Sequence, residues 1–138
     1  ITFAEVTRES IVNTDGTVEL VFYIKGKKIA RQVWSHDGEE VKTTGIIPNG
    51  TVKHYCGYGA IWEITYKNNL AEGISKMYDK KGKLRFQSKY KKGKLNDVSK
   101  VYYSDGKLMR EMHYQQGRLV TSKEYEKSGT LIFEQFFP

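Results

Sequence analysis

A glycine in a turn-forming context returns every two dozen residues or so, and this rhythm constrains the fold more than any other feature of the chain. The glycines are Gly16, Gly38, Gly59, Gly82, Gly106 and Gly129, separated by 22, 21, 23, 24 and 23 residues. A fixed period of this length is typical of repeat architectures, in which each copy is one small structural unit. Six copies fit the 138 residues, the last of them truncated.

The C-terminal copies align with one another residue by residue. Ser75–Leu84, Ser99–Leu108 and Ser122–Leu131 repeat at offsets of 24 and 23 residues, and an aromatic residue follows eight positions after each glycine, at Tyr90, Tyr114 and Phe137. A second turn follows in the first two of these copies, at Lys92-Gly93 and Gln116-Gly117. The N-terminal copies carry the same pattern more faintly: Trp34 and Tyr55 lie four positions before Gly38 and Gly59, whereas the Gly16 copy has Val12 at that position. We therefore expect one array over residues 1–138, with clear repeats over 73–138 and degenerate repeats over 10–72.

Within each copy the hydrophobic period is two, which indicates β-strands. Leu84, Phe86 and Tyr90 alternate with Arg85 and Lys89. Glycine at a turn between two such runs is typical of a β-hairpin, because the turn needs a positive φ. No stretch of ten residues has helical spacing with caps. The sequence predicts an all-β protein, a single elongated antiparallel meander of about six β-hairpin repeats.

Tyrosines recur in phase with these repeats and are the expected core. Isolated hairpins are marginal in water, so neighbouring hairpins must cover one another's apolar stripe. A row of rings on an open sheet can also stack bases or sugars, but repeat-phased rings are more often the core itself. The tyrosines in question are Tyr55, Tyr66, Tyr78, Tyr90, Tyr102, Tyr114 and Tyr125.

The repeated pattern resembles a known family. Tyr-x-x-x-Gly-Lys-Leu, then a tyrosine eight residues past the glycine, then a second Gly-Lys-Leu, is similar to the bacterial variant of the MORN repeat. The matching stretches are Tyr78–Leu95, Tyr102–Leu119 and Tyr125–Phe137. The resemblance implies a β-hairpin array that binds proteins or lipids, with no catalytic residue. Many bacterial members are labelled YwqK-type antitoxins, and many are exported or lipid-anchored, so both an exported or periplasmic and a cytoplasmic location stay open.

Positive charge is concentrated in the second half of the chain. Residues 73–138 contain 15 basic and 7 acidic side chains, whereas residues 1–72 contain 8 basic and 9 acidic ones. One interpretation is an anion-attracting patch; the other is a lysine-rich surface that keeps a thin sheet from pairing edge to edge. The candidate partner-binding residues are Lys80, Lys81, Lys83, Arg85, Lys89, Lys91 and Lys92.

Other chemistry finds little support. The single cysteine, Cys56, excludes an intramolecular disulfide and a cysteine-based zinc site. His36, His54 and His113 fall in different copies without metal-ligand spacing, and nothing orients His54 toward Cys56 as a catalytic pair. No phosphate-cradling glycine loop precedes a helix. We therefore expect no catalytic residue, no metal and no cofactor.

The chain has no apolar run of the roughly 18 residues that a membrane-spanning helix needs, and we expect no transmembrane segment. The sequence begins with Ile1 and not with Met, so we expect that an upstream leader, anchor or further domain has been removed.

Three functions remain open at this stage. The favoured one is a non-catalytic module that binds a protein partner, for which the antitoxin resemblance implies a toxin held by occlusion. The alternative is an exported or peripheral protein that binds an anionic membrane or envelope surface through the same basic patch. An enzyme is the least favoured, and nucleic acid is not an expected partner.

An unpaired strand edge also predicts a contact between copies of the chain. The last run of apolar residues, Leu131–Phe137, has no following hairpin to pair with. This edge, or the first strand around Phe3 to Val6, is where we expect an edge-strand homo-oligomer.

Overall fold

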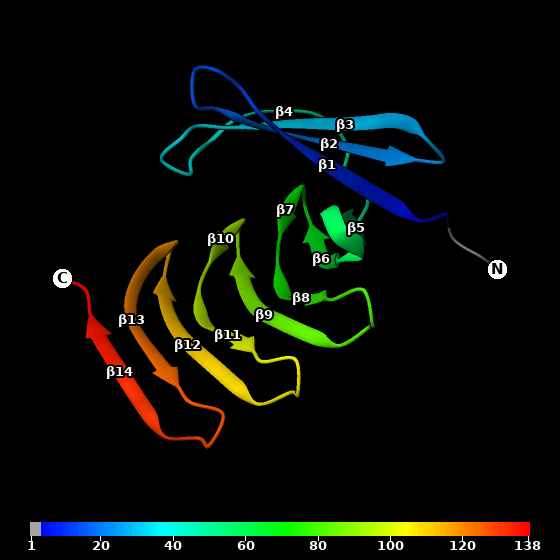
Figure 1. Ribbon diagram of the computed structural model, residues 1–138. Helices are drawn as coiled ribbons and strands as arrows, with labels where there is room; N and C mark the ends of the chain where they lie inside the picture. The colour runs from blue at the N-terminus through cyan, green and yellow to red at the C-terminus, as the bar shows by residue number, and fades with distance from the viewer. Residues whose placement is uncertain (1–3) are drawn as a thin grey trace.

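The structure, a computed structural model, describes residues 4–138 as one sheet of fourteen strands without an α-helix in that range (Figure 1). The predicted all-β fold of hairpin repeats is confirmed. The elements are β1 (Val6–Val12), β2 (Val18–Ile24), β3 (Lys27–Trp34), β4 (Glu40–Gly45), β5 (Gly50–Tyr55), the 3-10 turn η1 (Gly57–Gly59), β6 (Ile61–Lys67), β7 (Leu70–Ala71), β8 (Gly73–Tyr78), β9 (Leu84–Lys91), β10 (Lys94–Leu95), β11 (Asp97–Tyr102), β12 (Leu108–Gln115), β13 (Arg118–Tyr125) and β14 (Leu131–Phe136).

The six periodic glycines all lie between consecutive strands, in what we call the first turns. Their φ angles run from 79° to 91°, a range that favours glycine over every other residue. Aspartates fix several of these turns. Asp79 Oδ1 accepts hydrogen bonds from the backbone N–H groups of Lys81 and Lys83, at 2.9 and 3.0 Å, and Asp105 Oδ1 accepts one from Lys107.

At the opposite end of the hairpins, the second turns have positive φ at both central residues. They are Lys25-Gly26, Asn68-Asn69, Lys92-Gly93 and Gln116-Gly117. Two successive positive φ angles define the type I′ turn, whose twist matches that of the flanking strands. Hydrogen bonds then join one second turn to the next: the Gly93 N–H donates to the carbonyl of Ala71, and the Gly117 N–H donates to that of Leu95.

Two meanders make up the sheet, and they meet at an unexpected parallel pairing. From β5 to β14 the hairpins follow one another in chain order, and β1 to β4 form a separate meander. β1 pairs with β5 in parallel, with Val6 opposite Val52 and Arg8 opposite His54. The sequence predicted hairpin order throughout, and this order holds within each meander but not between β4 and β5.

The segment between β4 and β5 carries the chain across this junction. Ile47 is only 1% exposed and joins the core from this segment. Gly45 has a φ of 81°, and a Cβ at this position would lie 2.3 Å from the carbonyl oxygen of Ile29, so only glycine fits. The Ile47 backbone N–H donates to Asn69 Oδ1 at 2.8 Å. The connection is therefore a packed element and not a simple hairpin turn.

The edges of the sheet are β14 and β4. The expectation that the first strand forms an edge is wrong for the described part of that segment, because β1 is hydrogen-bonded to β2 on one side and to β5 on the other. Val6 is buried, whereas Phe3 lies outside the described residues. β14 is an edge strand, as predicted, and Ile132 and Phe136 on it are exposed.

The main apolar core lies where the two meanders meet. Phe22 is 0% exposed and packs edge-to-face against Tyr66, with ring centroids 5.2 Å apart. Val52 and Ile64 are fully buried beside them. Of the repeat-phased tyrosines only Tyr66 is fully buried. Tyr78, Tyr90, Tyr102, Tyr114 and Tyr125 are half-buried, and Tyr55 is exposed.

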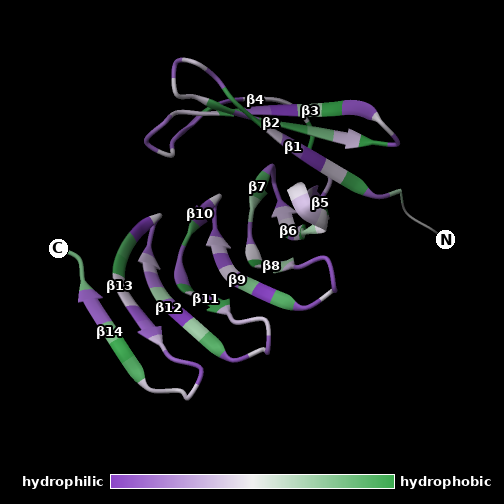
Figure 2. Ribbon diagram, in the orientation of Figure 1, coloured by the Kyte–Doolittle hydropathy of each residue, from purple (hydrophilic) through white to green (hydrophobic). Residues whose placement is uncertain are grey.

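Serines form the buried centre of the C-terminal hairpins. Ser75, Ser88, Ser99 and Ser122 are all buried, and Ser75 and Ser88 are hydrogen-bonded at 2.9 Å between their hydroxyls. Hydrophobic and hydrophilic segments alternate along the surrounding strands (Figure 2). The total accessible surface is 8946 Å², whereas a compact monomer of this mass exposes roughly 7400 Å². The sheet is thus more open than a globule.

Phe22 should therefore dominate stability. We expect Phe22→Ala to lower the free energy of unfolding by about 3–5 kcal/mol, because it leaves a cavity against Tyr66. Phe136→Ala, where the ring is 70% exposed, is the control and should cost less than about 1 kcal/mol. Urea unfolding of both variants measures the difference, and equal losses would show that the junction is not the principal core.

Candidate functional site

The structure places the seven candidate basic residues along the whole length of β9. Lys80, Lys81 and Lys83 lie at the first turn before this strand, and Lys91 and Lys92 lie at its other end. Lys83 and Lys91 are eight positions apart along extended chain, which corresponds to about 26 Å. The structure therefore brings together the members at each end but does not unite all seven in one patch.

Arg85 and Lys89, in the middle of the predicted stripe, are engaged within the protein. Arg85 is half-buried, its Nε donates to the carbonyl of Tyr102 at 2.9 Å, and its Nη1 lies 3.6 Å from Asp79 Oδ2. Lys89 Nζ lies 3.7 Å from Asp97 Oδ2. Arg85 thus connects β9 to β11 and has less freedom to meet a partner than the lysines at the turns.

The first turns of three successive hairpins carry exposed lysines in a row, which we call the lysine edge. Its members are Lys80, Lys81, Lys83, Lys107 and Lys127. Because two strands separate one first turn from the next, the turns are spaced by roughly 9.5 Å. Hydrogen bonds from backbone N–H groups, that of Lys83 foremost, lower the pKa of Asp79. The acidic side chain is thus committed to its turn, while Lys80, Lys81 and Lys107 have no carboxylate within 4.0 Å among the described residues.

The outer face of the C-terminal hairpins is different, because its charges alternate. One row of residues paired across successive strands consists of Lys53, Glu63, Lys76, Gln87, Lys100, Glu111, Lys123 and Glu134. Opposite charges in neighbouring positions stabilise a sheet modestly. The alternation leaves this row close to neutral, so it contributes little to the positive excess.

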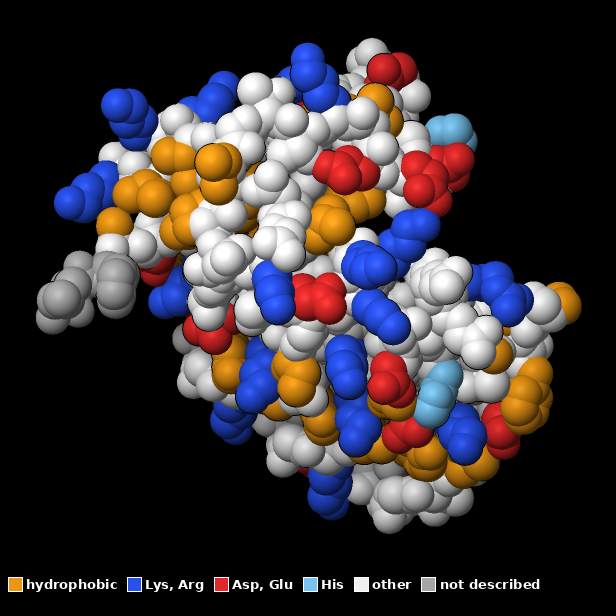
Figure 3. All heavy atoms as spheres, turned by 180° about the vertical axis from the view of Figure 1, so that it is seen from behind, with side chains coloured by type: hydrophobic (Ala, Val, Ile, Leu, Met, Phe, Trp, Pro, Cys, Tyr) orange, Lys and Arg blue, Asp and Glu red, His pale blue; other side chains and the backbone are white. Residues whose placement is uncertain are grey.

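A groove of about 710 Å³ separates the two meanders. The N-terminal strands β1 to β4 lie across the second-turn end of the C-terminal hairpins, and Figure 3 shows the surface hollowed between the two parts, with acidic side chains on one side facing basic ones on the other. The walls come from the first turns of the N-terminal meander and from the second turns of β9–β10 and β12–β13. The sequence pattern gave no indication of this groove.

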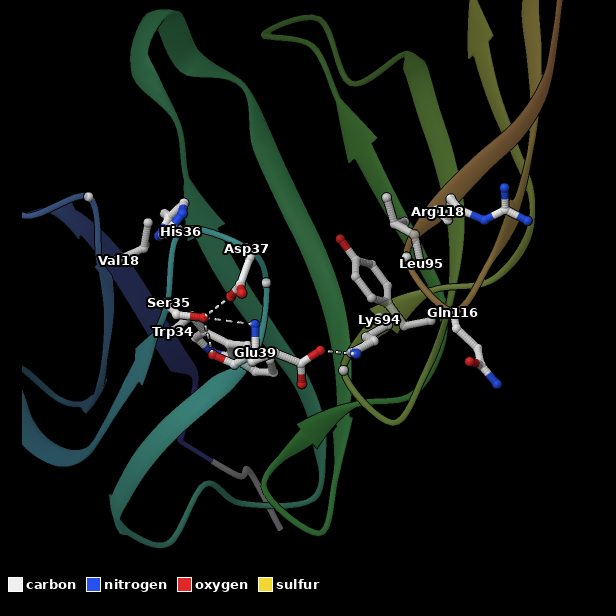
Figure 4. Close-up of a pocket in the computed structure, with 15 residues that line it drawn as sticks. Val18, Trp34, Ser35, His36, Asp37, Glu39, Lys94, Leu95, Gln116 and Arg118 are labelled. Atoms are coloured by element: carbon white, nitrogen blue, oxygen red, sulfur yellow. Dashed lines mark hydrogen bonds and ion pairs between the residues drawn. The ribbon is translucent and has the colours of Figure 1, made fainter. Parts of the chain in front are cut away.

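Two contacts connect the two walls of the groove. Glu39 Oε1 and Lys94 Nζ form an ion pair at 2.7 Å across it (Figure 4). An exposed pair of this kind contributes at most about 1 kcal/mol. The second contact is steric: Gly93 lies so close to Trp34 that a Cβ would come within 3.0 Å of the indole Cη2. The close approach of this glycine therefore shapes the groove more than the ion pair does.

Gln32 fixes the wall that carries Trp34. Its side chain is 1% exposed, and its amide nitrogen donates to the carbonyl of Asn69 at 2.7 Å. Its amide oxygen accepts a hydrogen bond from Trp34 Nε1 at 2.9 Å. A buried, satisfied amide of this kind joins the N-terminal meander to the β6–β7 turn and sets the orientation of the indole.

At its inner end the groove continues into a smaller cavity of about 220 Å³, lined in part by Arg8, Tyr66 and Tyr90. Arg8 Nη1 donates to the Tyr66 hydroxyl at 2.7 Å, and its Nε donates to His54 Nδ1 at 3.1 Å. The guanidinium also lies 5.4 Å from the centroid of the Trp62 ring. Burial raises the pKa of Tyr66. Burial of the His54 imidazole, followed by the nearby Arg8 charge, lowers the pKa of His54 from its usual 6.5.

Arg8, like Lys107 and Lys127 of the lysine edge, was not singled out by the sequence interpretation. The alternation of the strand gave a weak indication of its role, because Arg8 lies on the same face as buried Val6 and therefore points inward. The partners that make this position significant lie on strands 46 and 58 residues away. The alternation pattern alone could not bring them together.

The other residues considered for catalysis or metal binding are not assembled into a site. The His54 ring is bonded to Arg8, and the Cys56 thiol donates weakly to the backbone carbonyl of His54 at 3.8 Å instead of meeting its ring. His113 lies beside Glu111, and His36 is exposed in a turn. Within residues 4–138 no three His, Cys, Asp or Glu side chains cluster as metal ligands. The same residues include no helix that is long and apolar enough to span a bilayer.

The contact between Gly93 and Trp34 can be tested with a matched pair of substitutions. Gly93→Ala and Gly82→Ala both place a Cβ at a positive φ, 84° and 79°, but only Gly93 has neighbours within 4 Å. Each should lose about 1–2 kcal/mol of stability for the backbone conformation. Gly93→Ala should lose at least about 1 kcal/mol more, because Trp34 must move. Chemical denaturation followed by tryptophan fluorescence checks both, and equal losses with identical spectra would contradict the contact.

The lowered pKa of His54 predicts a pH dependence of stability. The native state favours neutral His54, so the unfolded state binds more protons between the lowered native pKa and 6.5. Stability should be full above this window, fall as the pH drops through it, and level off below the native pKa. His54→Gln keeps an acceptor for Arg8 but does not titrate, and should flatten the profile. Unfolding measured between about pH 7.5 and pH 5 tests this, and the same slope in both proteins would refute it.

Comparison with known proteins agrees with the repeat structure in part of the chain. No curated protein matches the sequence. Two adjacent segments, residues 71–92 and 98–116, match the family model described as the MORN repeat variant. These segments run from the last residue of β7 through β9 and from the second residue of β11 through β12, and each includes a first turn. Repeats of this family are in general binding modules and not enzymes. Residues 71–116 of this chain thus contain two copies similar to the MORN repeat variant.

Proposed function

We propose that this chain is a non-catalytic binding module that engages an acidic protein surface through the lysine edge. The observation that supports this most directly is the difference between the lysines and the acids in the first turns. The Asp79 and Asp105 carboxylates accept hydrogen bonds from backbone N–H groups, whereas Lys80, Lys81 and Lys107 are exposed. The turns thus present cations outward at regular spacing.

An aromatic side chain beside these lysines supports a protein as the partner. Tyr58 in η1 is fully exposed and has a φ of 64°. The turn that contains it lies against Lys80, because a Cβ on Gly59 would come within 2.9 Å of Lys80 Cβ. Tyrosine is enriched in protein interfaces, where a rigid ring supplies contact area at small entropic cost. Tyr58 is therefore the expected apolar anchor next to the cationic row.

Binding of this kind would work by steering and occlusion. Lysines at a rim raise the association rate with an acidic surface, and the effect falls as salt screens the charges. The resemblance to YwqK-type antitoxins makes a cognate toxin the first partner to test, with the module covering the toxin's functional surface. The open sheet offers a partner an extended contact of several hairpins.

An anionic membrane or envelope surface is the alternative target of the same lysines. Each lysine near an anionic bilayer contributes about 1 kcal/mol, so the five lysines of the edge would suffice for reversible attachment. The exposed Tyr58 ring beside Lys80 is compatible with this surface as well. The two targets are distinguished by experiment.

Charge reversal at the lysine edge tests the proposal. We expect the triple variant Lys80→Glu, Lys81→Glu, Lys107→Glu to lose the partner that the unaltered protein retains in a pull-down from native lysate at low salt. The matched control is Lys25→Glu, Lys27→Glu, Lys28→Glu, which makes the same charge change at exposed lysines of the β2–β3 turn.

The outcome of the comparison separates the possibilities. The control variant should retain the same partner, and increasing the salt concentration should weaken the binding of that partner to the control variant. If both variants lose the partner, the effect is one of net charge alone. If both variants retain the partner, the lysine edge is not the binding surface. Flotation with vesicles that contain or lack anionic lipid is the second arm, and binding to anionic vesicles without any protein partner would favour the alternative.

A further inference from the structure

Arg8 differs from the other half-buried arginines in having no acidic partner. Arg31, Arg85 and Arg110 lie 2.6, 3.6 and 2.6 Å from carboxylates of Glu19, Asp79 and Glu124. Among the described residues, no carboxylate lies within 4.0 Å of the Arg8 guanidinium. Its two hydrogen-bond partners, Tyr66 and His54, are both formally neutral.

The Arg8 guanidinium, which has no carboxylate partner among the described residues, favours the binding of an anion. Arg8 is half-buried, lines the cavity together with Tyr66 and Tyr90, and has its guanidinium 5.4 Å from the centroid of the Trp62 ring. A charge in a low-dielectric environment is costly unless it is paired. Arginine has five N–H donors, and the two bonds to Tyr66 and His54 leave three for a further acceptor. The planar fork fits a carboxylate with two parallel hydrogen bonds.

The cavity next to Arg8 has the size and lining of a site for a ring. Its volume is about 220 Å³, and Trp34, Tyr66 and Tyr90 supply aromatic walls, with Val18 and Leu20 among the aliphatic residues. An apolar cavity of about 150 Å³ is large enough for benzene. The cavity here therefore has room for a six-membered ring with a carboxylate attached.

A path connects this cavity to solvent. The cavity and the outer groove share four lining residues: Val18, Trp34, Tyr90 and Gly93. A ligand can thus enter along the groove and reach Arg8 at its inner end. The entrance lies at the second-turn end of the hairpins, opposite the lysine edge, so the two surfaces can be occupied independently.

We propose that the cavity binds the carboxylate of a small aromatic acid, with the Arg8 guanidinium and the Tyr66 hydroxyl holding the carboxylate and with Trp34 and Tyr90 flanking the ring. The same group can come from a free aromatic acid or from the C-terminal carboxylate of a peptide that ends in an aromatic residue. This site is separate from the proposed function at the lysine edge, and neither depends on the other.

Binding of benzoate to the whole chain tests the proposal, with benzamide as its uncharged analogue. We expect saturable millimolar binding of benzoate, observed as a change in tryptophan fluorescence and by ligand-observed NMR, and much weaker binding of benzamide. A short peptide ending in phenylalanine, compared with its C-terminal amide, forms the second arm. Tighter binding of the peptide acid than of benzoate identifies a chain terminus as the source, and the reverse identifies a free acid.

Two variants remove the site in different ways. Arg8→Gln keeps a donor for Tyr66 but removes the charge, and should weaken benzoate binding about tenfold or more. Val18→Phe leaves Arg8 in place and fills the cavity, and should abolish binding. Arg31→Gln, at an arginine outside the cavity, is the control and should bind as the unaltered chain does. Circular dichroism and thermal melting confirm that each variant is folded.

Three results would overturn the proposal. These are equal binding of benzoate and benzamide, unchanged benzoate binding in a folded Val18→Phe variant, and absence of benzoate binding to the folded, unaltered chain at millimolar concentration.

Discussion

The parallel pairing of β1 with β5 is the constraint on which the rest of the structure depends. Only three residue pairs make it, from Val6 with Val52 to Arg8 with His54, yet it joins the two meanders into one sheet. Because β1 takes this place beside β5, the N-terminal hairpins turn back over the second turns instead of extending the row. The principal core, the groove and the Arg8 cavity all lie within this overlap. A chain with the same hairpins in simple order would have a thin sheet with no enclosed space.

Charge is arranged by position within the repeat. On the outer face the paired row alternates between basic and acidic side chains, which supports the sheet and limits the net field there. At the first turns the Asp79 and Asp105 carboxylates accept hydrogen bonds from the backbone, whereas Lys80, Lys81 and Lys107 are exposed. One repeat pattern therefore yields a nearly neutral row and a cationic edge, and copying the pattern lengthens both.

The sequence predicted the turns and strands, which depend on neighbouring residues, but it did not predict the contacts between residues that are far apart in the chain. The rhythm from Gly16 to Gly129 placed every first turn, because a positive φ is a property of single residues. Alternation predicted the strands, and the family resemblance predicted the two segments that the family model matches. The groove could not be predicted, since it depends on Gln32 meeting Asn69 and on Trp34 meeting Gly93 across long separations. Lys80, Lys81 and Lys83 of the first turns were found from the distribution of charge, but Lys107 and Lys127 were not, and the separation of this edge from Lys91 and Lys92 by the length of β9 required the structure.

The hydrogen bonds that join successive second turns determine where such a chain can gain or lose whole hairpins during evolution. Each hairpin from β8 onward is hydrogen-bonded only to its immediate neighbours. Duplication or loss of a whole hairpin after β10 would therefore extend or shorten the cationic row without touching the partners of Arg8, which lie on β5 and β6. A change of equal size before β6 would dismantle the overlap itself. Whole hairpins can thus be gained or lost on the C-terminal side of the overlap more readily than within it.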